Sequence, residues 1–237
     1  MSDDARKEPK FPWDYEVPND AFWNSLEYTL ARNFLQCYNE SEISKMHFDA
    51  TLPSPEKLKY LRRYLDNTFE EKDKKAAPVP LHDADYQTWL HLKLAMSTVE
   101  FFLENYDDEE VIVREMYENG PDGTKSMSAL HQLSAVMEKT RRYTEAEAMA
   151  KEVLPWMQGH ELLGRDSPQA LSGLRILATS VWKQKRYVDG EEWMSRYERT
   201  IDDMKNGKFG KYEDAERKLY TDTRQVLDQW RKEHVDA

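Results

Sequence analysis

The sequence contains one cysteine and few glycines, and both shortages limit the folds that are possible. Cys37 has no second cysteine to pair with, which excludes an intramolecular disulfide framework and a thiolate-based zinc site. The chain has 8 glycines, and β-branched runs bounded by glycine-rich turns are scarce, whereas Glu, Lys, Leu, Ala and other strong helix formers fill long stretches. The composition therefore predicts an all-α fold.

Long apolar runs and clusters of basic residues are also missing. No run approaches the roughly 20 apolar residues needed to cross a bilayer, so we predict no membrane span. A formal net charge of -11 argues against nucleic acid or an anionic membrane as partner, because both bind clustered Lys and Arg. The first residues, Met1 to Asp4, carry neither a basic leader nor an apolar segment. These features together predict a cytoplasmic location.

Familiar catalytic and metal-binding motifs are absent from the sequence. The chain has no Gly-rich phosphate loop, no G-x-S-x-G and no H-E-x-x-H. Its one local histidine cluster, His82-Asp83-x-Asp85 followed by His91, is better explained by acids that cap a helix than by metal ligands. The acidic run 107–110 is similarly typical of a helix start, where it complements the helix dipole. We expect no cofactor, no metal and no enzyme activity, although distant side chains could still assemble a catalytic site.

Turn-forming residues divide the chain into segments. Residues 1–18 are polar and predict a flexible arm, and a helical pair is expected over 19–75. A charged run and then Ala76-Ala77-Pro78-Val79-Pro80 predict a domain boundary or hinge. A second helical pair over 82–120 is expected to pack on the remainder, 126–237.

The most informative feature of the sequence is an internal repeat at an offset of 44 residues. Residues 127–150 align with residues 171–194 with about seven identities, where roughly one or two would arise by chance. A fixed period in this range indicates stacked helix pairs that bury their faces against one another. The identical pairs are Ser128/Ser172, Leu130/Leu174, Leu133/Leu177, Lys139/Lys183, Arg142/Arg186, Tyr143/Tyr187 and Glu147/Glu191.

Other positions in and after the repeat predict local structure. Small residues, Ala146 and its counterpart Gly190, are expected where two helix backbones approach closely. Pro155 predicts a kink or an early end in the second helix of the first copy. A lone capping helix should begin near Gly210, with Leu219, Val226 and Trp230 facing inward.

The repeat resembles a known family. The segments 141–147 (RRYTEAE) and 185–191 (KRYVDGE) resemble the G-K-Y-x-E-A-E turn of tetratricopeptide repeats, and 163–170 (LGRDSPQA) resembles the linker of the kinesin-light-chain subtype. The resemblance covers about residues 126–235 and implies a right-handed α-solenoid, which with the N-terminal helices comprises about nine helices. Where the subtype has paired asparagines that clamp a peptide backbone, this chain has His131-Gln132 and Arg175-Ile176.

The first helix of each pair is expected to line a concave face. We expect cationic side chains on this face to bind a partner's carboxylates. One exposed aromatic side chain is expected to anchor the partner's apolar groups. The alternative is that Lys139 and Lys183 are ordinary solvated helix ends and that Trp182 packs on the next helix. The candidate ligand-binding residues are His131, Glu138, Lys139, Arg175, Thr179, Trp182 and Lys183.

The resulting functional hypothesis is a non-catalytic adaptor that binds a peptide or protein segment in this concave face. One alternative is a small enzyme or small-molecule binder with a pocket between the N-terminal helices and the repeats. A second alternative is a structural subunit whose faces are buried in an oligomer.

Overall fold

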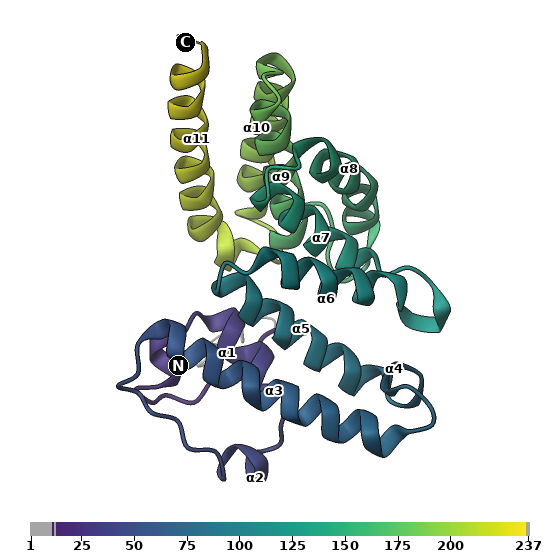
Figure 1. Ribbon diagram of the computed structural model, residues 1–237. Helices are drawn as coiled ribbons and strands as arrows, with labels where there is room; N and C mark the ends of the chain where they lie inside the picture. The colour runs from purple at the N-terminus through teal and green to yellow at the C-terminus, as the bar shows by residue number, and fades with distance from the viewer. Residues whose placement is uncertain (1–10, 12, 236–237) are drawn as a thin grey trace, which may run out of the picture. The chain divides into compact units, whose positions relative to one another are not determined.

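The computed structural model describes residue 11 and residues 13–235, and this part of the chain contains helices and no strands. The prediction of an all-α, helical-repeat fold is confirmed (Figure 1). Two of the helices are single turns, and the other nine agree with the expected number. The helices are α1 Tyr28–Leu35, α2 Glu40–Ile43, α3 Ser54–Ala76, α4 Leu81–Ala84, α5 Tyr86–Phe102, α6 Tyr106–Glu118, α7 Met127–Lys139, α8 Tyr143–Gly159, α9 Pro168–Lys183, α10 Tyr187–Met204 and α11 Glu213–Val235.

The chain divides into two compact units, and the division falls within α6, after Ile112. None of the helices in the described ranges is long and apolar enough to span a bilayer. Most of the arm predicted over residues 1–18 lies outside the described residues, and residues 14–18 are not helical.

The first unit is built around the long helices α3 and α5, which pack against each other. An ion pair joins them, with Arg62 Nε 2.6 Å from Glu100 Oε1. The segment 76–80, where the sequence suggests a boundary or hinge, connects α3 to α4 and α5 within this unit. Apolar side chains from α1, α3 and α5 fill its core: Leu30, Phe34, Leu61, Leu65, Trp89, Leu92 and Val99.

The acidic residues at two helix starts in this unit lie where the sequence predicts them. The Asp85 carboxylate accepts a hydrogen bond from the Thr88 amide at 3.1 Å and caps α5. Asp107, Asp108 and Glu109 occupy the first turn of α6, where negative charge complements the helix dipole. Both clusters therefore have a structural explanation.

The second unit contains two helical hairpins, α7–α8 and α9–α10, followed by α11. Each helix from α7 to α10 packs against the next, and α11 packs on both α9 and α10 (Figure 1). The aligned leucines of the two copies are all buried, with Leu130, Leu133, Leu174 and Leu177 at most 2% exposed. The repeat detected in the sequence is thus a structural repeat.

The turn inside each hairpin has the same backbone geometry. Arg141 and Lys185, one offset of 44 apart, both have a left-handed conformation, with φ of 63° and 64°. The following amide donates back into the helix: Arg142 N to Met137 O at 2.8 Å, and Arg186 N to Val181 O at 3.3 Å. This is a Schellman motif, in which glycine is the usual left-handed residue.

The prediction of small residues where helices approach closely is confirmed at Gly190. A Cβ atom added to Gly190 would lie 2.9 Å from Cε3 of Trp182, closer than real Cβ contacts allow. Trp182 is 0% exposed and has no room to move aside. The counterpart, Ala146, is also 0% exposed.

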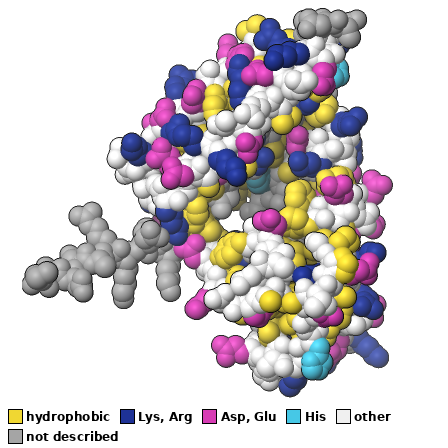
Figure 2. Space-filling view, turned by 90° about the vertical axis from the view of Figure 1, so that its left-hand side faces the viewer, with side chains coloured by type: hydrophobic (Ala, Val, Ile, Leu, Met, Phe, Trp, Pro, Cys, Tyr) yellow, Lys and Arg dark blue, Asp and Glu magenta, His cyan; other side chains and the backbone are white. Residues whose placement is uncertain are grey.

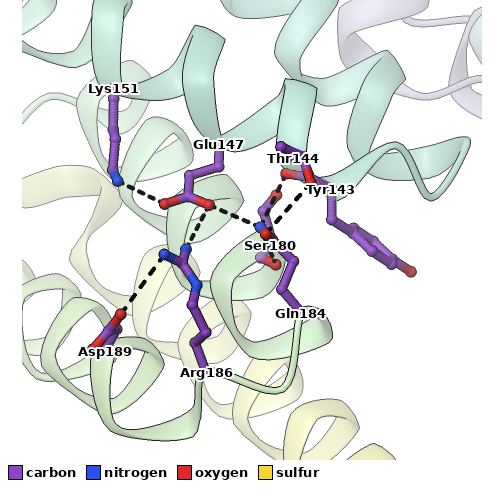
Figure 3. A network of polar contacts seen from close by, with 8 residues as sticks. All are labelled: Tyr143, Thr144, Glu147, Lys151, Ser180, Gln184, Arg186 and Asp189. Carbon is purple, nitrogen blue, oxygen red and sulfur yellow. Dashed lines mark hydrogen bonds and ion pairs between the residues drawn. The ribbon is translucent and has the colours of Figure 1, made fainter.

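A polar network joins the two copies around Glu147 (Figure 3). The carboxylate of Glu147, which is 7% exposed, receives Arg186 Nη2 at 2.5 Å, Lys151 Nζ at 2.6 Å and Gln184 Nε2 at 2.8 Å. Burial by itself would raise the pKa of Glu147, but these three donors outweigh it, and the pKa falls to about 2. Glu147 therefore ties α8 to the turn of the following hairpin.

The aligned residue Glu191 makes the corresponding link to α11. Arg224 donates to its carboxylate in a bidentate arrangement, at 2.5 and 2.9 Å. Glu147 and Glu191, which are aligned in the repeat, thus have equivalent roles: each binds an arginine from the next part of the chain.

Two local expectations in this unit were wrong. Of the kink or early end expected at Pro155, the early end was wrong, because α8 continues to Gly159 with Pro155 exposed at the surface. On α11, Leu219 and Val226 were expected to face inward, but they are 40% and 60% exposed, and Leu227 is the buried residue at 1%. The two adjacent apolar residues Val226 and Leu227 explain the second error, because helical neighbours point about 100° apart.

Candidate functional site

A groove in the second unit contains several of the residues selected from the sequence. It has a volume of about 250 Å³ and lies among α7, α9 and α11, the first helices of the two hairpins and the capping helix. Acidic, basic and apolar side chains share it, and the same mixture covers the face drawn in Figure 2. Its lining residues are Glu138, Lys139, Arg175, Ile176, Thr179, Leu219, Asp222, Thr223, Val226 and Leu227.

Four of the seven predicted residues therefore lie together: Glu138, Lys139, Arg175 and Thr179. Glu138 and Lys139 come from the last turn of α7, and the other two stand one turn apart on α9. Lys139 is exposed, with its Nζ 4.0 Å from Glu138 Oε2. The projection of the repeat onto helices thus identified one wall of the groove.

Trp182 is not an exposed anchor, so that expectation was wrong. Its side chain is 0% exposed, and its Nε1 donates to Leu227 O of α11 at 3.0 Å. The alternative kept open from the sequence, that Trp182 packs on the next helix, is confirmed. A buried indole is satisfied here by a backbone carbonyl, as its N–H requires.

Lys183 is also engaged by α11. Its Nζ lies 4.7 Å from the centre of the Trp230 ring, in a cation–π contact. Burial lowers the pKa of Lys183. Lys183 therefore belongs to the junction of α9 with the capping helix and does not line the groove.

Helix α11 supplies the groove's second wall, which the sequence analysis missed. Leu219 and Val226 project into it as exposed apolar side chains, with Asp222 and Thr223 between them. Spacings of three, four and seven residues put these positions on one face of the helix. The signal was present in the sequence as this spacing, but it was assigned to the buried face.

Arg175 is the most unusual residue in the groove. Among the described residues, no carboxylate oxygen lies within 4.0 Å of its guanidinium, and its one hydrogen-bond contact is Nη2 to Ser172 Oγ at 3.5 Å. Its Nε is buried and has no acceptor. A half-buried guanidinium that lacks a counter-ion carries an unmet requirement for an anion or an acceptor.

His131 occupies the position in α7 that corresponds to Arg175 in α9. It is half-buried, and its Nδ1 is shielded from solvent without a hydrogen-bond partner. Burial, together with the positive charge of Arg175, lowers the pKa of His131 to about 4. His131 is therefore neutral at pH 7 and adds no positive charge; it does not line the groove.

Two further ionisable groups respond to the charge of Arg175. Glu216 of α11 is buried, and its Oε2 accepts a hydrogen bond from Tyr197 Oη of α10 at 3.1 Å. Burial raises the pKa of Glu216, and the charge of Arg175 partly offsets that rise. The positive charge of Arg175 thus acts on a carboxyl group of α11.

Two observations on the described residues concern metal binding and the single thiol. No set of three or more His, Cys, Asp or Glu side chains is placed there to hold a metal ion. Burial raises the pKa of the Cys37 thiol to about 12, and its Sγ donates to Asn33 O at 3.3 Å. That thiol is protonated at neutral pH and is a poor nucleophile.

Comparison of the chain with protein-family models, with curated proteins and with solved structures gives no match.

Proposed function

We propose that the second unit is a tetratricopeptide-like adaptor, related in design to the kinesin-light-chain subtype, that binds a peptide or protein segment in the groove of α7, α9 and α11. In such arrays the first helices line the concave face, and the same helices line this groove. The protein acts without catalysis, as a scaffold for its partner.

The observation that carries this proposal is the pairing of Arg175 with exposed apolar residues in one groove. Arg175 has no carboxylate partner in the described structure, and Leu219 and Val226 stand beside it with 40% and 60% of their surface exposed. A segment that brings a carboxylate and an apolar side chain would satisfy both features. The carboxylate can be an Asp or Glu side chain or a free C-terminus.

The size of the groove also favours a peptide over a whole small molecule. Its volume of about 250 Å³ falls below the roughly 300–1,000 Å³ typical of pockets that enclose a drug-sized ligand. A few side chains of an extended segment fit such a space while the rest of the segment lies outside it.

Selection from random peptide libraries tests the proposal. The full chain is immobilised and panned against two phage-displayed libraries, one with internal peptides and one with free C-termini. We expect enriched sequences that combine a carboxylate with an apolar residue. The synthetic form of an enriched peptide should bind at least about 10-fold more weakly to Arg175→Gln, because a charge-assisted pair is lost.

Arg63→Gln is the matched control, since it makes the same substitution at an exposed residue of α3. It should leave peptide affinity unchanged. If the chain enriches no peptide over the bare support, the adaptor proposal fails. If enriched peptides bind equally to wild type and to Arg175→Gln, the groove is the wrong place.

The structural-subunit alternative makes a different prediction. A copy of the chain that covers Leu219 and Val226 would give an oligomer in light scattering, and Val226→Asp would dissociate it. We expect a monomer whose mass does not change with concentration.

A further inference from the structure

Three arginines converge on a second surface of the repeat unit. Arg165 lies in the loop between α8 and α9, and Arg196 and Arg199 lie one turn apart on α10. All three line one open depression, together with Gln158 in the last turn of α8 and with Asp202 and Asp203. None of these residues lines the groove of α7, α9 and α11.

None of these arginines has a counter-ion among the residues that the structure describes. Within the part of the chain that the structure describes, no carboxylate oxygen lies within 4.0 Å of any of the three guanidinium groups. Other arginines of the same unit do pair: Arg186 with Glu147, Arg217 with Asp202 and Arg224 with Glu191. In a chain of net charge -11, carboxylates are plentiful, so three neighbouring arginines without one are conspicuous.

The groups that face this depression are mainly hydrogen-bond donors. Arg196 Nη2 donates to Gln158 Oε1 at 3.1 Å, which turns the amide nitrogen of Gln158 away from Arg196. That Nε2 is buried and has no acceptor. Arg199 donates its Nε to Ser195 O at 3.2 Å, which leaves its two terminal nitrogens available.

We propose that Arg165, Arg196 and Arg199 form a binding site for a phosphate group, with Gln158 Oε1 holding the guanidinium of Arg196. A phosphate presents acceptor oxygens and up to two negative charges, which match guanidinium donors in the forked geometry that arginine favours. The phosphate can be free in solution or can be carried on a phosphorylated side chain, since both present the same oxygens. The site does not depend on the proposed function of the groove.

Two aspartates modulate the site unequally. Asp202 is held by Arg217 Nη2 at 2.9 Å, which neutralises much of its charge. Asp203 is exposed and has no ion pair in the described structure, so it repels an anion in the depression. Removal of its charge by Asp203→Asn should therefore tighten phosphate binding by about 2-fold or more.

Titration of the full chain, with the arginine Nε–Hε NMR signals as readout, tests the site directly. One arm uses inorganic phosphate and the other a short phosphoserine peptide, with its unphosphorylated form alongside, and sodium chloride holds the ionic strength constant. We expect saturable shifts of the Arg196 and Arg199 signals in at least one arm, with no response to the unphosphorylated peptide. Saturation by the phosphoserine peptide alone would identify a phosphorylated partner, and saturation by inorganic phosphate would identify the free ion as sufficient.

Arg199→Gln and Arg165→Gln change exposed residues, so the fold should survive both. Each should weaken binding by about 5-fold or more. Lys218→Gln removes one positive charge from an exposed position of α11 and should leave the affinity unchanged. Equal weakening by all three variants would mean general charge attraction and would overturn the proposal, as would an absence of saturation in both arms.

Discussion

The two copies of the repeat differ most instructively at the ends of their first helices. Glu138 in copy one and Trp182 in copy two are aligned, one repeat offset of 44 residues apart. Glu138 lines the groove, whereas Trp182 is fully buried beneath α11 and hydrogen-bonded to Leu227. Copy one is followed by another hairpin, but copy two is followed by a single helix. The terminal copy therefore uses a large aromatic residue to anchor its cap, at a position where the other copy has a half-exposed residue that lines the groove.

A second aligned pair shows how the neighbour decides the role of a side chain. Arg142 pairs with Glu145 of its own turn, at 2.7 and 2.6 Å. Its counterpart Arg186 reaches back to Glu147 of the preceding copy, at 2.5 Å. Arg186 also pairs within its own turn, with Asp189 at 3.7 Å. Identical residues in the two copies thus occupy equivalent positions in the turn. The partners of each side chain also depend on the elements that lie next to it.

The difference between the two copies should have its largest effect on stability at Trp182. Trp182→Ala should lower the free energy of unfolding by about 3–5 kcal/mol, because it opens a large cavity and leaves the Leu227 carbonyl without its donor. The aligned change Glu138→Ala should cost less than about 1 kcal/mol, since that side chain is half-exposed. Urea denaturation of both variants measures the difference.

Hydrogen exchange then locates the damage. Relative to wild type, Trp182→Ala should speed amide exchange more in α11 than in α7 and α8. Equal costs for the two substitutions, or uniform loss of protection across the unit, would show that Trp182 is ordinary core and does not specifically hold the cap.

The link between the copies can be tested through its pH dependence. The folded state holds the pKa of Glu147 at about 2, below its ordinary value of 4.5. The stabilisation that the ionised Glu147 contributes is therefore complete above about pH 5. It is lost as the pH falls from about 5 to about 2. Glu147→Gln should cost about 2 kcal/mol at pH 7, because it leaves Arg186 and Lys151 without their carboxylate, and this cost should shrink towards pH 2.

Glu191→Gln is the matched variant at the aligned position. Its carboxylate is more exposed, so water can replace more of the lost interaction, and the cost at pH 7 should be smaller. Urea titrations at pH 7, 4 and 3 check both variants. A cost for Glu147→Gln that is the same at every pH would contradict the assigned role of its charge.

Much of this unit could be predicted from the sequence because the relevant contacts are local. Ser167 before Pro168 predicts an N-cap, and the Ser167 hydroxyl does accept the Ala170 amide at 3.2 Å. The hairpin turns follow in the same way from the repeated R/K-R-Y pattern, since their hydrogen bonds join residues five apart or fewer. Because these hydrogen bonds join residues close in the sequence, the caps and turns could be predicted without the tertiary structure.

The two walls of the groove show where such prediction stops. The wall from α7 and α9 followed from the repeat, but the wall from α11 depends on how that helix is rotated about its axis. Val226 and Leu227 are both apolar, and the sequence does not say which of them is buried. The absence of a counter-ion for Arg175 within the described ranges is likewise a property of three packed helices. Neither feature is encoded within a single helix.

The smallest expected effect concerns the left-handed residues in the turns of the two copies. Arg141 and Lys185 adopt the left-handed conformation that glycine accepts without strain. Arg141→Gly and Lys185→Gly should therefore each stabilise the protein, by about 0.5–1 kcal/mol. Lys139→Gly, the same type of change two residues before Arg141 but within α7, should instead destabilise it by about 1 kcal/mol. Thermal and urea unfolding measure all three. Equal gains at residues 141 and 185 would mean that the turns are energetically as well as geometrically repeated, whereas a gain in one copy alone would show that the neighbouring element, hairpin or cap, sets the strain.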